Sequence, residues 1–95
     1  MGVVQDITVD EYILAFFNEL NIQSQGIHLM DPLTAKFNEL KILNLSFNLI
    51  TRIENIPPNL EELYLNGNMV DHIQLNVNKP INSLIHLGLN RNKIR

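Results

Sequence analysis

Apolar and polar positions alternate in a fixed order along the second half of the chain. Three segments align without gaps on the pattern L-x-x-L-x-L-x-x-N-x-φ, in which φ is an aliphatic residue. The matching positions are Leu40, Leu43, Leu45, Asn48 and Ile50; Leu60, Leu63, Leu65, Asn68 and Val70; and Leu84, Leu87, Leu89, Asn92 and Ile94. Since every position of the pattern is filled each time, the chain contains an internal repeat.

Each L-x-L centre predicts a short strand, because successive side chains of an extended chain point to opposite faces. The two leucines then point inward, and the asparagine can satisfy backbone groups where the chain turns. The asparagines follow one another by 20 and 24 residues, within the range of leucine-rich repeats. We therefore expect an α/β fold, a leucine-rich-repeat solenoid with a short curved parallel sheet. The threefold register outweighs the alternative of a hairpin turn at Asn66-Gly67.

The residues before the first full repeat predict a helix and a degenerate repeat. Thr8 and Glu11 have the spacing of a capping box, so a helix should begin at Thr8. An apolar stripe follows at helical spacing and can cover the first edge of the core, or else dock onto a partner: Ile13, Phe16, Phe17 and Leu20. Ile27-His28-Leu29 has the pattern of a leading strand, and Asp31-Pro32 ends it. Pro32 would then stand at the asparagine position.

The length of 95 residues, with 45% hydrophobic residues, suits a single domain. Within it, residues 1–36 should hold an N-terminal capping helix and the degenerate first repeat. Residues 37–95 should hold three leucine-rich repeats, the last of them incomplete. Pro57-Pro58 leaves only a short return path after the first full repeat, so no long helix is expected there.

Composition narrows the class of protein. The chain has no cysteine, which excludes disulfides and thiolate metal sites and fits a reducing compartment. The net charge of −3 does not suggest a nucleic-acid binder. The first twenty residues contain no Lys or Arg, unlike a signal peptide, and no apolar run approaches the roughly 18 residues of a membrane span. We expect a cytoplasmic protein with no membrane contact.

The titratable residues do not predict a catalytic or metal site. His28 and His86 would lie three strands apart, about 14 Å, which is too far to share a metal ion. Glu61 and Glu62 are adjacent on a strand and should point in different directions, so they make no acid/base pair. No glycine-rich phosphate loop is present. We expect no enzymatic activity, no cofactor and no metal.

Residues between and beside the inward leucines should face the concave surface of a solenoid. We expect this surface to bind a protein through Ile42, Asn44, Phe47, Glu62, Tyr64, Asn66, His86 and Arg91, with His28, Met30, Ser46, Gly88 and Asn90 completing it. Its apolar members would form a patch rimmed by polar groups, and Tyr and Arg are frequent interface anchors. The alternative is that Phe47 tucks into the core and Ile42 is an isolated surface residue.

Charge is distributed unevenly along the sequence. The first 35 residues hold five acids and no Lys or Arg, whereas the residues after Asp71 hold four bases and no acid. In a solenoid the C-terminal end would then be basic and attract an acidic partner, such as a tubulin surface. The alternative is that Arg91, Lys93 and Arg95 merely flank a strand.

Residues 37–95 resemble the cytosolic leucine-rich repeats of about 22 residues found in the protein phosphatase-1 regulatory subunit class and in many axonemal proteins. The segments that carry a closer resemblance to one such protein are Ile56-Pro57-Pro58-Asn59-Leu60, Leu63-Tyr64-Leu65-Asn66-Gly67-Asn68 and His86-Leu87-Gly88-Leu89-Asn90-Arg91-Asn92-Lys93. This resemblance implies a link to motile cilia, axonemal or tubulin-associated partners, and a longer parent protein. It leaves open two non-catalytic roles, a protein-interaction module and a structural component of the ciliary axoneme.

Overall fold

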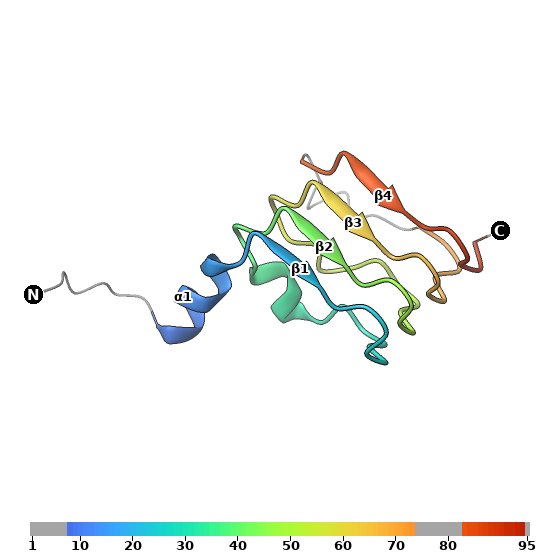
Figure 1. The fold of residues 1–95 in the computed structure, drawn as a ribbon, viewed down its shortest axis with the longest axis horizontal. Helices are drawn as coiled ribbons and strands as arrows, with labels where there is room; N and C mark the ends of the chain where they lie inside the picture. The colour runs from blue at the N-terminus through green and yellow to red at the C-terminus, as the bar shows by residue number, and fades with distance from the viewer. Residues whose placement is uncertain (1–7, 74–82, 95) are drawn as a thin grey trace, which may run out of the picture.

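The computed structural model describes residues 8–73 and 83–94 of the chain. Its elements are helix α1 (Val9–Phe16), strand β1 (Glu19–Asn21), the 3-10 helix η1 (Pro32–Lys36), and strands β2 (Ile42–Asn44), β3 (Glu62–Tyr64) and β4 (His86–Gly88). The strands form one four-stranded parallel sheet in the order β1-β2-β3-β4. Strands that follow one another in sequence are therefore neighbours in space, and the loops after them lie side by side (Figure 1). This arrangement is compatible with the expected α/β class.

Each strand with the turn that follows it forms one rung of this stack, and the inward residues of the rungs build the core. The inward residues of the first two full repeats are buried, as predicted: Leu40, Leu43, Leu45, Ile50, Leu60, Leu63, Leu65 and Val70. Leu43, Leu63 and Leu87 are in register on neighbouring strands. In the last repeat Leu84, Leu87 and Leu89 are only partly buried, because no later rung covers them within the described ranges.

The first rung lies earlier in the chain than expected. Leu20 of β1 is in register with Leu43 of β2, so the leading repeat spells Phe17-x-x-Leu20-x-Ile22 and ends at Ile27. These four apolar residues pack against the core. The predicted strand at Ile27-His28-Leu29 is therefore wrong, because Ile27 already fills the last inward position of that rung, and His28 is exposed.

Helix α1 begins where the capping pattern predicts, and the amide of Tyr12 donates to the carbonyl of Thr8 at 3.0 Å. The helix ends at Phe16, and Figure 1 shows it projecting beyond β1. Ile13 and Phe16 are exposed, Phe16 to 65%. The predicted stripe covers the core only through Phe17 and Leu20, which lie beyond the helix. The division of the chain at residue 36 stays a prediction.

The return after the first full repeat contains no helix, as Pro57-Pro58 predicts. η1, drawn in teal in Figure 1, connects β1 to β2, and the side chain of Asp31 caps it by accepting a hydrogen bond from the amide of Leu33 at 3.0 Å. Residues 51–59 contain no helix. Met30, predicted to lie on the concave surface, is instead buried in the core, because it belongs to this return path and to no strand.

Asparagines connect each rung to the one before it. The Oδ1 atom of Asn48 accepts from the amide of Ile27 at 2.9 Å, and Nδ2 donates to the carbonyl of Ile22 at 2.9 Å. Asn68 and Asn92 repeat this geometry one and two rungs later. The predicted structural role of the asparagines is confirmed. In the first rung the equivalent position is Gln25, not Pro32, and Gln25 is exposed.

Candidate protein-binding surface

The outward residues of the four strands share one face of the sheet, which we call the strand face. One row across it is Glu19, Ile42, Glu62 and His86, and the next is Asn21, Asn44, Tyr64 and Gly88. All eight of these residues are half-buried or exposed. The structure thus brings together six of the predicted surface residues, and Asn66 stands two residues beyond the end of β3. The six are Ile42, Asn44, Glu62, Tyr64, His86 and Gly88. Ser46 was expected beside them but is buried.

Tyr64 is held in place at the centre of the strand face. Its hydroxyl donates to Oε1 of Glu62 at 2.5 Å, and its ring lies 5.1 Å from the ring of His86, measured between centroids. A Cβ atom at Gly88 would lie 3.1 Å from Cδ1 of Tyr64. The absence of a side chain at Gly88 therefore leaves room for the tyrosine ring beside β4.

The same contacts set the protonation of Tyr64. The hydrogen bond to the Glu62 carboxylate, together with partial desolvation and the negative charge of Glu62, raises the pKa of Tyr64 above its usual value. Tyr64 is therefore a neutral hydrogen-bond donor near pH 7 and not a phenolate nucleophile.

The amides of Asn44 and Asn66 stabilise the ends of the strands. Oδ1 of Asn44 accepts from the amide of Ser46 at 3.0 Å, and Oδ1 of Asn66 accepts from the amide of Asn90 at 2.8 Å. Each bond uses the oxygen of the side chain, so the two N–H groups of its amide can serve as further donors. These residues can give polar contacts at the rim of a binding site.

Phe47 and Arg91 do not lie on the strand face. Both have a positive φ of 59° in the turn after the strand, at the same repeat position as Gly67. This backbone turns their side chains away from the strand rows. The alternative that Phe47 enters the core is also wrong, since its side chain is 51% exposed. The predicted surface is thus divided between the strand face and the turns.

Two exposed apolar residues of the turns were not predicted as site residues. Leu49 is 51% exposed and Met69 is 38% exposed. Each stands between a buried asparagine and a buried aliphatic residue, so the alternation of the pattern turns it outward. That alternation is visible in the sequence and could have identified both residues.

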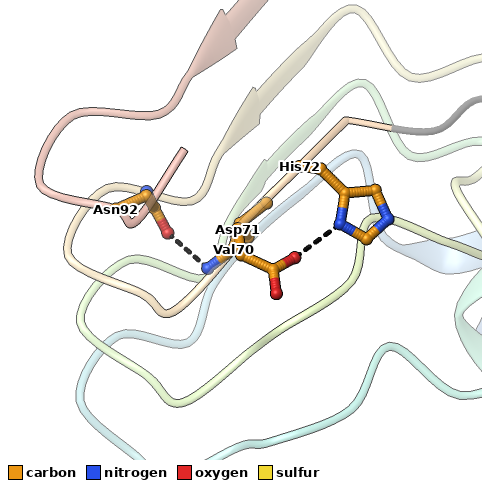
Figure 2. Close-up of polar contacts among 4 residues, drawn as sticks. All are labelled: Val70, Asp71, His72 and Asn92. Atoms are coloured by element: carbon orange, nitrogen blue, oxygen red, sulfur yellow. Dashed lines mark hydrogen bonds and ion pairs between the residues drawn. The ribbon is translucent and has the colours of Figure 1, made fainter. Parts of the chain in front are cut away.

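The titratable residues of the described ranges do not form a metal-binding cluster. No group of three or more His, Cys, Asp or Glu in residues 8–73 and 83–94 could hold a metal ion. His72 and Asp71 make an exposed pair, with Nδ1 and Oδ1 2.6 Å apart (Figure 2). None of the helices in these ranges has the length and apolar character that a membrane crossing requires.

Comparison with known proteins gives two relatives. The chain is 36% identical to mouse leucine-rich repeat-containing protein 43 over 87 residues, which are 90% of this chain and 13% of that protein. It is 33% identical to the human protein of the same name, with the same coverage of 90% and 13%. No family model matches the chain, and no solved structure matches it. The chain spans 13% of the length of these relatives and is similar to leucine-rich-repeat proteins, as its repeats predict.

Proposed function

We propose that this chain is a non-catalytic protein-interaction module, a leucine-rich-repeat solenoid whose strand face binds a segment of another protein. The similarity to leucine-rich-repeat proteins supports an interaction role in general. The observation that carries the specific proposal is the fixed position of Tyr64, which Glu62 and His86 hold at the centre of the strand face.

A tyrosine held in this way is suited to anchor a partner. Tyrosine offers a large apolar ring with few rotatable bonds, and it is enriched among the residues that dominate binding energy. Because Tyr64 is already ordered, little conformational entropy is lost when a partner binds it. Ile42 lies on the neighbouring strand, where it pairs with Glu62 one outward row from Tyr64, and adds apolar area near the ring.

The charges of the strand face favour a partner with a basic side chain. Glu19 and Glu62 stand in the same row, and the two strand rows contain no Lys or Arg. A lysine or arginine of the partner would meet the carboxylate of Glu62 and the face of the Tyr64 ring together. The preferred segment therefore carries a basic residue next to an apolar one.

Substitution of the central residues tests this proposal. We expect Tyr64→Ala and Ile42→Ala each to weaken partner binding by more than about 1 kcal/mol while the fold stays intact. The partner is captured from ciliated cells with the wild-type chain and identified by mass spectrometry. Its purified binding region is then titrated calorimetrically against each variant.

Matched controls separate the strand face from the rest of the surface. Leu33→Ser changes an exposed apolar residue of η1, outside the strand face, and should leave this affinity unchanged. If both Tyr64→Ala and Ile42→Ala bind the partner with unchanged affinity, the strand face is not the binding site.

The cellular setting is part of the same proposal. We place the interaction in the cytoplasm, including that of motile cilia, and the second role left open is that of a structural axonemal component. A regulated module should wash off isolated microtubule doublets at high salt, whereas a structural component should remain bound. Immunoblotting of the washed doublets and of the supernatant distinguishes the two.

A further inference from the structure

Exposed apolar residues of successive turns line up beside the strand face. We call Phe47, Leu49 and Met69 the turn ridge. The amide of Leu49 donates to the carbonyl of Ile27 at 2.7 Å, and the amide of Met69 donates to the carbonyl of Ile50 at 2.8 Å. These bonds place Leu49 and Met69 on neighbouring rungs, roughly 4.8 Å apart.

Phe47 completes the ridge by lying across the next rung. A Cβ atom at Gly67 would lie only 2.5 Å from Cδ1 of Phe47. The phenyl ring therefore occupies the space that a side chain at position 67 would need. The three ridge residues form an apolar surface over two rungs, although each keeps more than a third of its area exposed.

The backbone beneath the ridge is rigidly bonded. Asn48 and Asn68 are buried on either side of it, and the amide of Phe47 donates to the carbonyl of Asn66 at 2.7 Å. Large apolar side chains that are exposed on a fixed backbone add little to folding. A contiguous group of them on a soluble protein is characteristic of an interaction site.

The next rung continues the ridge with positive charge. The amide of Lys93 donates to the carbonyl of Val70 at 2.8 Å, and Arg91 has the same repeat position and φ as Phe47. Both basic residues are exposed. Within the described ranges no carboxylate lies within ion-pair distance of either.

Acidic residues are absent from the turns themselves. Residues 24–27, 46–50, 66–70 and 90–94 contain no Asp or Glu. Asp71 directly follows the third of these turns, and Figure 2 shows its carboxylate directed to His72. The turn ridge is therefore apolar over two rungs, and the rung that follows it is basic.

We propose that the turn ridge is a second binding site, which takes a short partner segment whose acidic residues adjoin apolar ones. The apolar side chains of the segment cover Phe47, Leu49 and Met69, and its carboxylates face Arg91 and Lys93. This site is separate from the strand face, whose charges select a basic segment. Anionic membranes also attract apolar and basic side chains, but such recognition uses clusters of about four to eight bases, and the rung beside the ridge has only Arg91 and Lys93.

A random-peptide library displayed on phage provides the probe. The library is selected on the complete chain, and enriched peptides are synthesised with a fluorophore and titrated by anisotropy. We expect the selected peptides to combine Asp or Glu with large apolar residues. Leu49→Ser combined with Met69→Ser should weaken their binding at least about tenfold, while Tyr64→Ala leaves it unchanged.

The charge requirement is tested separately. Arg91→Gln combined with Lys93→Gln should weaken binding severalfold and reduce its dependence on salt, because exposed charges act through a screened field. The four substituted residues Leu49, Met69, Arg91 and Lys93 are exposed, so the urea unfolding midpoints of these variants should match that of the wild type.

Three results would overturn the inference. The first is a selection that yields no acidic and apolar preference, and the second is unchanged affinity in both ridge variants. In the third, phosphatidylserine vesicles bind the chain through the ridge while no peptide does. If only Tyr64→Ala abolishes peptide binding, the peptides bind the strand face and the turn ridge is excluded as their site. The two proposals therefore fail independently.

Discussion

Asn48→Ala is expected to lower the free energy of unfolding by at least about 3 kcal/mol. The side chain is buried, and its Oδ1 accepts from the amides of Gln25 and Ile27 at 2.9 Å each. Its Nδ2 donates to the carbonyls of Ile22 and Leu45 at 2.9 Å each. Each buried backbone group that loses its partner costs roughly 1 to 3 kcal/mol. Urea unfolding followed by circular dichroism measures the change.

Asn59→Ala is the matched control for this substitution. The side-chain Nδ2 of Asn59 also donates to a backbone carbonyl, that of Asn38 at 2.7 Å, but this hydrogen bond is exposed to solvent. Water can replace it, so the change should stay within about 0.5 kcal/mol. Equal effects at the two positions would show that the buried asparagine does not hold the rungs together.

Leu65→Ala is expected to destabilise the fold by about 2 to 5 kcal/mol, because truncation leaves a cavity in the core. Leu65 is 0% exposed and belongs to the buried cluster with Leu45 and Leu63. The same urea titration gives the value. Leu49→Ala removes the same atoms from a half-exposed leucine and should change stability little. A near-neutral result at Leu65 would mean that the inward register is wrong.

The core of the full repeats could be predicted from spacing alone. Where leucine recurs with asparagine, as at Leu63, Leu65 and Asn68, the pattern predicts which side chains point into the core and which residue bonds to the backbone. Burial of these residues confirms the prediction.

The first rung could not be located with the same rule. Phe17 and Leu20 stand three residues apart, a spacing that an amphipathic helix and the start of this repeat share. Ile13 and Phe16 precede them at helical spacing, so the sequence alone predicts one helix for all four. The first rung also lacks an asparagine to reveal its register. Only strand pairing distinguishes the two assignments, and Leu20 pairs with Leu43.

The candidate site was predicted in part. Ile42, Glu62 and His86 lie in one row as expected, because side chains along a strand alternate between the two faces of the sheet. The sequence predicts Phe47 and Arg91 on the same surface, because neither residue type indicates a positive φ. Their turn backbone, at 59° for both, directs them to another surface. That partners bind either surface stays a prediction.

The asparagine bonds also have a direction along the chain. The amide of Ile27 is held by Asn48, that of Ile50 by Asn68 and that of Val70 by Asn92. A ribosome releases the chain from its N-terminus, and folding during synthesis follows that order. Each turn therefore emerges before the side chain that will hold it. The hydrogen bonds of a turn are consequently complete only once the following repeat has formed.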